Sequence, residues 1–445
     1  MLIRICLCLA LFAAIPVWSQ VAPSATETGI TTVDDTQMMT PHPVSGESYP
    51  ITVGDEVRSN YLAAGVVFTS AYDDNVLAGE GTAPIRDLTY SIWPTVTLDQ
   101  ATSRQRRVLT YSPGFTFYQH TTALNATDQN AALSFLYRLS PHITANVQDA
   151  FQKSSNAFNQ PYPLSGGGIS GSTPSPTATV IVPFADRLGN TVNASISYQF
   201  SRNGMIGGGG DFEVLDFPNS SQVPGLYNSH SSGGSAFYSA RLSKMQYIGV
   251  TYQYSRILAY PLNAESEAQT HSFLPFYTIY LNRTFSISVL AGPQHFNATQ
   301  THFPSSSAWT PTVMASVGWQ RSRTNLVARY SHAVTGGGGL VGAYNSTSAD
   351  AIARWQIAHT WTVGAEGIYA NYKNVSALEA SASPGGHAVS GTTSLQHPFN
   401  DHFMLEFGYD RLHQSYASIA VIASAPDSNR VFLSLTYRFA KPLGR

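Results

Sequence analysis

Near its end the chain reads Asn429-Arg430-Val431-Phe432-Leu433-Ser434-Leu435-Thr436-Tyr437-Arg438-Phe439, and apolar and polar side chains alternate along this stretch. Successive side chains of a β-strand point to opposite faces. The stretch therefore predicts a strand with one apolar face and one mostly polar face. A transmembrane barrel requires such a strand, with lipid outside and a polar lumen inside.

The same stretch resembles the carboxy-terminal signal of bacterial outer-membrane β-barrels, in which apolar residues at every second position end in Tyr-x-Phe. Here that ending is Tyr437-Arg438-Phe439, although the family pattern usually stops at the aromatic residue and six residues follow it in this chain. The resemblance implies that the barrel-assembly machinery is a partner. It also implies an assembly signal made of Val431, Leu433, Leu435, Tyr437 and Phe439.

The composition of the 445-residue chain also favours a membrane barrel. Charged residues make up 11% of it, whereas soluble domains contain about 25%. Aromatic residues reach 12%, and the mean hydropathy of −0.08 excludes a helical membrane protein rich in long apolar segments. The net charge of −2, with no basic run, argues against nucleic acid as a partner.

Residues 1–19 have the pattern of a secretory signal peptide. Arg4 provides a positive charge, residues 5–17 are apolar, and Val17-Trp18-Ser19 is a plausible cleavage site. Both cysteines of the chain, Cys6 and Cys8, lie in this segment, so the mature chain would have none. That excludes a disulfide framework, a thiol nucleophile and cysteine-bound metal. We expect secretion to the periplasm and insertion into the outer membrane.

The remaining chain divides into three parts. Residues 20–58 are rich in Thr, Ser, Pro and Gly, and we expect a flexible periplasmic segment without its own core. Residues 59–440 form the expected barrel, and 441–445 a short extension. The barrel region repeats alternating strands at 60–72, 87–99, 105–119, 129–139, 142–153, 191–201, 204–216, 234–244, 246–257, 270–281, 284–297, 310–320, 323–334, 347–358, 360–373, 386–397, 402–413 and 429–439.

The connections between these eighteen stretches alternate between short and long. Outer-membrane barrels have short periplasmic turns and long extracellular loops, and an even strand number places both termini in the periplasm. The predicted fold class is therefore an all-β, transmembrane, antiparallel up-and-down β-barrel of about 16–18 strands. Residues 271–281 fit less well, because they are apolar on both faces.

The strand directions place many aromatic residues at the periplasmic ends of the strands, on the outer face. Such a belt is typical of membrane barrels. Its predicted members are Tyr137, Phe200, Phe285, Trp319, Trp355, Trp361, Phe403 and Phe439.

The charged residues expected in the lumen differ in their position along the barrel axis according to the sign of their charge. Arginines predicted toward the periplasmic half are Arg106, Arg138, Arg241, Arg354 and Arg438, and acidic residues predicted at the extracellular side are Asp73, Asp74, Glu80, Glu265, Glu267 and Glu379. At mid-height, one wall carries Arg329, Glu366 and Glu406. Such groups can bias ion passage, and we take Arg329, Glu366, Glu406, Arg354, Arg241, Arg138 and Arg438 as candidate selectivity residues. Two alternatives without a role in ion passage remain open. Charges near a rim can simply be solvated, and the mid-height group can be an ion network that braces the wall.

The longest connection, 154–190, has no charged residue between Lys153 and Asp186. Resemblance to general porins implies that this third extracellular loop folds into the pore and narrows it. The loops of those porins carry acidic groups, which this one lacks.

Motifs for catalysis or cofactors are weak. The Gly336–Gly339 run has no following Lys-Ser/Thr, so it does not predict a phosphate site, and no His-x-x-x-His or Gly-x-Ser-x-Gly motif occurs. We therefore expect no enzyme activity, no cofactor and no metal site, with an outer-membrane hydrolase as a third choice.

As a whole, residues from about 60 to 439 resemble uncharacterised porin-like barrel proteins of Gram-negative bacteria. The leading hypothesis is passive diffusion of small polar solutes or sugars, because of the strand number and an expected lumen of Ser, Thr, Asn, Gln and Gly with few charges. Outer-membrane lipid and lipopolysaccharide would surround such a barrel, and homo-oligomerisation is left open. A second hypothesis is a component of exopolysaccharide export or surface assembly. It depends on three aromatic residues expected to face inward and to stack on sugar rings, Trp93, Phe237 and Tyr247.

Overall fold

The computed structural model describes residues 38, 40, 41, 44, 60–76, 84–154, 186–219, 225–261, 265–282, 284–301, 303–337, 340–375, 385–416 and 427–443. Residues 1–19, most of the predicted loop at 154–190, Glu80 and Glu379 lie outside the described residues. No helix among the described residues is long and apolar enough to cross a membrane.

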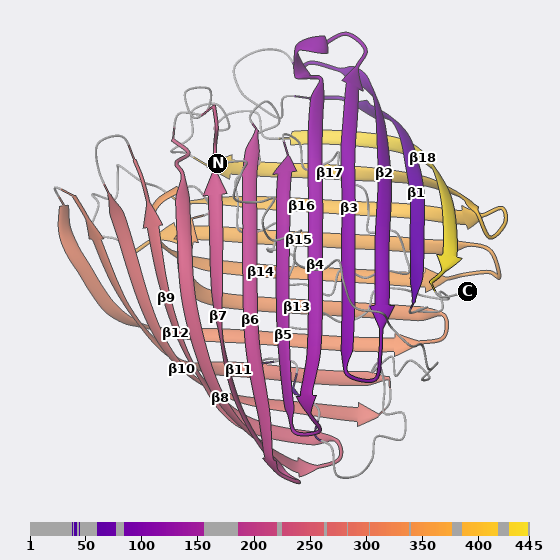
Figure 1. The fold of residues 1–445 in the computed structure, drawn as a ribbon. Coiled ribbons are helices and arrows are strands. Elements are labelled where there is room, and N and C mark those ends of the chain that lie inside the picture. Colours follow the sequence, from indigo (N-terminus) through magenta and orange to yellow (C-terminus); the bar gives the residue numbers. More distant parts are fainter. Residues whose placement is uncertain are drawn as a thin grey trace, which may run out of the picture.

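Within the described residues, eighteen antiparallel strands make up the fold (Figure 1). They are β1 (Tyr61–Asp73), β2 (Asp87–Ala101), β3 (Gln105–Tyr118), β4 (Ala126–Ser140), β5 (Ile143–Ser154), β6 (Arg187–Ser201), β7 (Gly204–Asp216), β8 (Ser229–Ser243), β9 (Gln246–Ala259), β10 (Ser266–Asn282), β11 (Phe285–Gln300), β12 (Phe303–Arg321), β13 (Thr324–Gly337), β14 (Leu340–Gln356), β15 (Thr362–Asn374), β16 (Gly386–Pro398), β17 (Phe403–Tyr416) and β18 (Asp427–Pro442).

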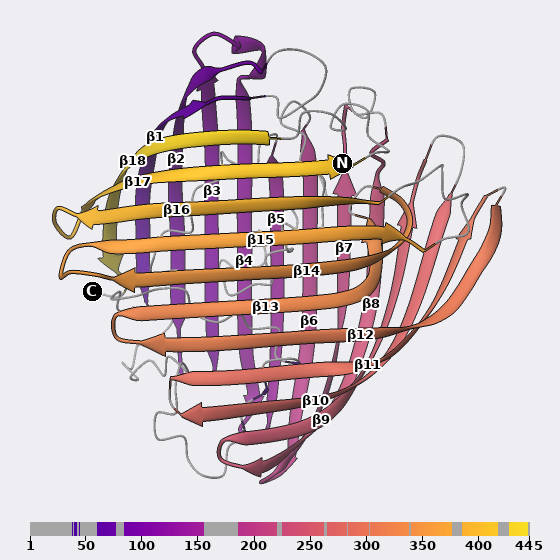
Figure 2. The same ribbon diagram turned by 180° about the vertical axis from the view of Figure 1, so that it is seen from behind.

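Each strand pairs with its neighbours in the chain, and β1 pairs with β18, so the sheet closes on itself. The predicted fold class, an antiparallel up-and-down barrel, is confirmed. Figures 1 and 2 show two walls whose strands cross at a large angle, as expected when every strand is tilted relative to the barrel axis. We call the end with the short turns periplasmic and the end with the long loops extracellular.

Most predicted strand boundaries agree with the structure to within a few residues. The largest differences are at β12, which begins at Phe303 rather than 310, and β14, which begins at Leu340 rather than 347. These added residues do not alternate cleanly, yet they continue the ladders with β11 and β13. Backbone pairing beyond the alternating region therefore lengthens both strands at the extracellular end.

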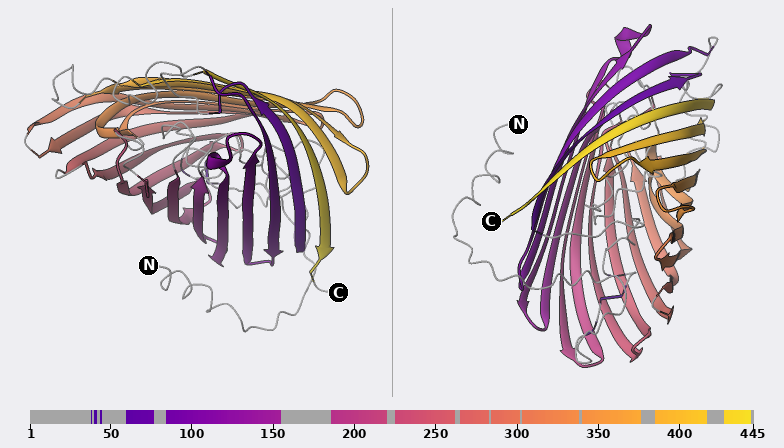
Figure 3. Two further views of the ribbon diagram at one scale, coloured as in Figure 1. Left: turned by 90° about the horizontal axis from the view of Figure 1, so that it is seen from above. Right: turned by 90° about the vertical axis from the view of Figure 1, so that its right-hand side faces the viewer.

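The outer face of the barrel is apolar. Exposed residues on β18 include Val431, Leu433, Leu435, Tyr437 and Phe439, whereas Ser434 and Thr436 of the same strand are buried inside. The eight aromatics predicted for the periplasmic belt occupy the expected ends of the outer face. Among them, Phe285 and Trp319 are register partners, and the ring of Phe403 lies 5.0 Å from that of Tyr437. Figure 3 shows the barrel from above and from the side.

The seam between β1 and β18 is held by side chains as well as by backbone pairing. Hydroxyls of Thr69 and Ser434 lie 2.7 Å apart. At the extracellular rim, Ser428 Oγ donates to Asp73 Oδ1 at 2.9 Å. The backbone and side-chain nitrogens of Asn429 donate to the Asp74 carboxylate at 2.7 and 2.8 Å. The two aspartates predicted as lumen charges therefore serve as hydrogen-bond acceptors that fasten the seam.

The last strand extends beyond Phe439, so the boundary predicted at 440 lies inside it. Pro442 is the register partner of Tyr61, and Leu443 N donates to Asn60 O at 2.7 Å. Asn60 has a positive φ of 63°, a conformation that asparagine tolerates better than most residues.

Truncation after Phe439 is expected to weaken the seam by about 2 kcal/mol, because a few backbone hydrogen bonds are lost at about 0.5–1.5 kcal/mol each. Urea unfolding of the refolded protein in detergent would measure this loss. Lys441→Ala keeps the backbone and serves as the control. Unchanged unfolding of the truncated chain would show that these pairs contribute nothing to closure.

Candidate functional site: the barrel lumen

Neutral polar side chains line much of the inner wall. Several are paired across neighbouring strands through their hydroxyls: Thr95 with Ser112 at 2.7 Å, Thr97 with Thr110 at 3.2 Å, Thr278 with Ser288 at 2.5 Å, and Ser331 with Ser348 at 2.7 Å. In each pair either hydroxyl can donate. Cross-strand hydroxyl pairs stabilise the sheet and leave the lumen polar but uncharged at these positions.

The inner side of β13–β18 carries most of the mid-height charges. Arg329 Nε lies 2.9 Å from Asp350 Oδ2, on the neighbouring strand. Glu366 interacts electrostatically with Asp350, Arg354 and Arg329. We call the following inward residues the charged wall: Arg329, Asp350, Arg354, Glu366, Glu406, Asp410 and Arg430.

The remaining carboxylates of the charged wall are held by neutral partners. Gln396 Nε2 donates to Glu406 Oε1 at 2.9 Å, and Thr392 Oγ1 donates to Asp410 Oδ1 at 2.8 Å. Asp410 and Arg430 are register partners on the inner face, and both are buried. Asp350, Asp410 and Arg430 were missed by the sequence analysis, although each has the alternation phase of the inward residues on its strand.

The other predicted arginines are not grouped with the charged wall. Arg241 donates to Arg202 O at 2.8 Å and to Asn203 Oδ1 at 3.2 Å, both in the β6–β7 turn. Arg438 Nη2 lies 3.4 Å from Met404 Sδ, and Arg138 is exposed near the end of β4. Arg106 pairs with Asp99 at 3.0 Å. These groups are distributed around the periplasmic part of the inner wall.

One predicted lumen charge was placed on the wrong face. Glu267 lies on the outer surface, where its Oε1 is 2.6 Å from Arg256 Nε of β9. The reason is that β10 begins at Ser266, before the predicted start at 270, so that Glu267 shares the outward phase of Phe273. The predicted acidic rim of the lumen is therefore weaker than expected.

A hydrophobic cluster joins the two walls at the extracellular end. Leu340 and Tyr344 of β14 pack with Leu215 of β7 and with two residues of the β7–β8 connection, Phe217 and Leu226. Figures 1 and 2 show that β7 and β14 belong to different walls. Ala370, Tyr372 and Tyr416 complete the cluster. Contacts between opposite walls can form only across the lumen.

A second hydrophobic cluster holds the extracellular ends of β13 and β14 against β10 and β11. The β12–β13 ladder ends at Val313 and His332, after which Gln294 of β11 binds the backbone of Val334. Gln294 Oε1 accepts from Val334 N at 2.8 Å, and Gln294 Nε2 donates to Val334 O at 3.2 Å. Val334 and Ala343 pack with Ala268, Phe296 and Ala298. We call residues 334–337 and 340–344 the crossing hairpin.

Glycine at position 336 permits the close approach of the crossing hairpin to the far wall. A Cβ atom there would lie 2.8 Å from Ile257 Cγ2 of β9, inside van der Waals contact. The glycine run that does not fit a phosphate site thus has a packing role at its first residue.

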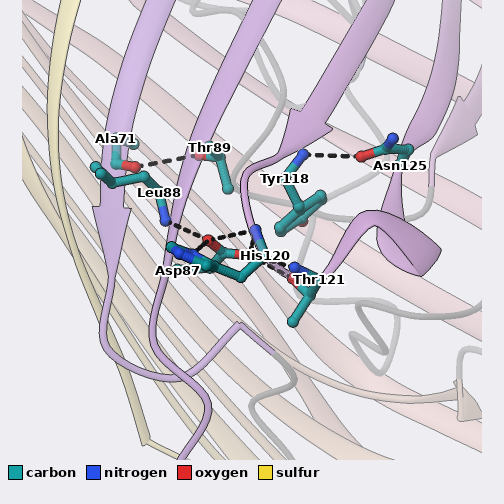
Figure 4. A network of polar contacts seen from close by, with 8 residues as sticks. All are labelled: Ala71, Asp87, Leu88, Thr89, Tyr118, His120, Thr121 and Asn125. Atoms are coloured by element: carbon teal, nitrogen blue, oxygen red, sulfur yellow. Dashed lines mark hydrogen bonds and ion pairs between the residues drawn. The ribbon is translucent and has the colours of Figure 1, made fainter.

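A carboxylate at the extracellular end of β2 anchors the β3–β4 connection (Figure 4). Asp87 accepts hydrogen bonds from the backbone nitrogens of Leu88, His120 and Thr121, and Thr121 Oγ1 donates to it at 2.6 Å. His120 Nδ1 lies 2.9 Å from the same carboxylate. With its acceptor positions occupied, Asp87 acts as a structural anchor.

No protein-family model matches the sequence, and no curated protein matches it. Among solved structures, ferric citrate transporter FecA in the unliganded form is similar at 10% identity and a TM-score of 0.41, covering 91% of this chain and 82% of that chain. Outer membrane protein opdK from Pseudomonas aeruginosa has 7% identity, a TM-score of 0.40, and coverages of 85% and 99%. OccK2 (OpdF) from Pseudomonas aeruginosa, in complex with glucuronate, has 9% identity, a TM-score of 0.41, and coverages of 85% and 98%.

The fold is that of an outer-membrane β-barrel. It follows from the closed ladder, the apolar outer face and the aromatic belt of this chain. The solved structures above are too distant to indicate a function for this barrel. Among the residues described, no three His, Cys, Asp or Glu side chains lie close enough together to hold a metal ion.

Proposed function

We propose that this protein is an outer-membrane channel for passive diffusion of small polar solutes, and that the crossing hairpin closes it in the present conformation. The observation that supports the proposal is the lumen lining of paired hydroxyls with charges gathered on one wall. Barrels of 16–18 strands are wide enough to enclose an aqueous channel. Solutes with hydroxyl or amide groups would exchange hydrogen bonds with such a lining.

In this proposal the exposed apolar belt contacts outer-membrane lipid and lipopolysaccharide, after secretion directed by residues 1–19. The residues of the predicted assembly signal lie on the outer face of β18, where the barrel-assembly machinery could reach them.

Single-channel recording of the purified protein in planar bilayers tests the proposal. We expect rare openings of the unmodified protein and frequent openings once the crossing hairpin is displaced. A correctly folded barrel that conducts in neither state would rule out the channel function.

The export hypothesis depended on three aromatic rings that would stack on sugars, and these rings are buried. Trp93 is 1% exposed and packs against Gly114, while Phe237 and Tyr247 are buried in an apolar cluster. None of these three rings presents a free face on which a sugar could stack.

The charged wall is proposed to set ion preference. Asp350→Asn would remove the carboxylate that pairs with Arg329 and one negative charge from the charged wall, so the open channel is expected to shift toward anions. Reversal potentials in a salt gradient measure that shift.

Asp149→Asn is the matched control, because Asp149 lies on the outer face and accepts from Asn190 Nδ2 at 2.8 Å. The control should leave the reversal potential unchanged. Equal reversal potentials for Asp350→Asn and the unmodified protein would mean that the charged wall only braces the barrel.

A further inference from the structure

An apolar patch interrupts the polar inner wall. Its members come from six neighbouring strands, β7 to β12, and all have the inward alternation phase. We call these residues the apolar seat: Met205, Phe237, Tyr247, Leu274, Phe276, Leu290, Tyr280 and Met314. The seat explains why residues 271–281 are apolar on both faces: their outer face meets lipid and their inner face belongs to the seat.

The seat lies toward the periplasmic end of the lumen. Met205 is the second residue of β7, Tyr247 is the second residue of β9, and Tyr280 lies near the end of β10. Apolar side chains in an aqueous channel would be exposed to water unless something covers them. Yet Leu274 and Phe276 are only 0% and 2% exposed. Part of that burial comes from Val44, a residue outside the wall that packs against this group.

Residues that precede the barrel provide this cover. Met38 packs with Met205, Phe237 and Tyr247, and Val44 packs against both this group and the group around Leu274. Met38 is itself 7% exposed. One short segment thus contacts both halves of the seat.

Hydrogen bonds fix the segment in place. Met38 N donates to the side-chain Oε1 of Gln199 at 3.0 Å, and Gln199 Nε2 is held by Ser201 O at 3.0 Å. Val44 N donates to Pro41 O at 3.0 Å, which closes a turn that brings Val44 back to the wall. Apolar burial together with a few placed polar groups is the pattern of a ligand-binding site.

We propose that the apolar seat is an intramolecular peptide-binding site for Met38, Thr40, Pro41 and Val44, and that the bound segment is a plug in the periplasmic half of the lumen. The binding part is independent of any transport activity. Only the plugging effect rests on the proposed channel function. The plug and the crossing hairpin then obstruct the lumen at two different heights.

Cross-linking tests the binding site without reference to conductance. The full-length Met38→Cys/Met205→Cys protein, in isolated outer membranes, is treated with a short bis-maleimide, and linked peptides are identified by mass spectrometry. The predicted mature chain has no other cysteine, so the pair is specific. The control pair, Met38→Cys/Ser112→Cys, joins the segment to an inward residue of β3. We expect at least tenfold more cross-linking for the Met205 pair.

A second variant tests whether Val44 anchors the segment. Val44→Asp in the Met38→Cys/Met205→Cys background is expected to reduce cross-linking several-fold, and Val44→Leu to preserve it. Equal cross-linking of the Met205 and Ser112 pairs, or no effect of Val44→Asp, would overturn the binding site.

Conductance separates this inference from the channel proposal. In a barrel whose crossing hairpin is displaced, Val44→Asp is expected to raise conductance several-fold further. Conductance that does not change with Val44→Asp would overturn the plug. Cross-linking without conductance in any variant would uphold the binding site and overturn the channel function. Conductance without specific cross-linking would uphold the channel function and overturn the binding site.

Discussion

Replacing Leu340 with aspartate is expected to open the extracellular end of the lumen. Leu340 is 3% exposed and lies in the cluster that joins β14 to β7 and the β7–β8 connection. An unpaired carboxylate in that cluster would cost about 3 kcal/mol, which lowers the closed-to-open ratio by about 100-fold. Single-channel recording in planar bilayers would show this change as a large rise in open probability.

The barrel itself should survive the substitution, because Leu340 is the first residue of β14 and lies at the extracellular end, away from the lipid-facing surface. Leu340→Ile keeps the apolar contact and is expected to remain closed. Electrophoretic mobility with and without heating verifies that both variants are folded. If a folded Leu340→Asp barrel opens no more often than Leu340→Ile, the crossing hairpin is not the closure.

Ile196→Arg is expected to destabilise the barrel by about 2–4 kcal/mol, because it places a charge on the lipid-facing surface. Ile196 is 51% exposed on the outer face of β6, and its neighbour Ser195 faces the lumen. The expected loss is measured by urea titration of folding into lipid vesicles.

Ser195→Arg makes the same chemical change one residue away, on the opposite face. It is expected to cost less than 1 kcal/mol, because the side chain lies opposite Gly209 and extends into the lumen. Comparable losses for the two variants would contradict the assignment of the outer and inner faces.

The strands could be predicted from the sequence because alternation is a local signal. The phase of Leu433 and Ser434 in β18, for instance, is visible without knowledge of any other strand. Boundaries at Phe303 and Leu340 could not be predicted, since those residues are in strands only through backbone pairing with β11 and β13. The alternation phase of Asp350 is sufficient to assign it to the charged wall, since it faces inward with Arg354 of the same strand.

The contents of the lumen could not be predicted, because they depend on contacts between parts of the chain that are far apart. Met38 and Gln199 are separated by 161 residues, and nothing local to either indicates the other. The sequence shows that residues 271–281 are apolar on both faces, which differs from the other strands. The reason is that Val44 packs against the inner face at Phe276.

The seam carries a consequence for the order in which the molecule folds. Among the eighteen described strands, every ladder except β1–β18 joins strands that are neighbours in the chain, whereas Ser428 and Asp73 are 355 residues apart. Bringing such distant residues together carries a large entropic cost of loop closure while the intervening chain is unfolded. Once the neighbouring hairpins have formed in sequence, most of that entropy has already been lost. The seam is therefore expected to close last, after an intermediate in which β1 and β18 are two unpaired strand edges.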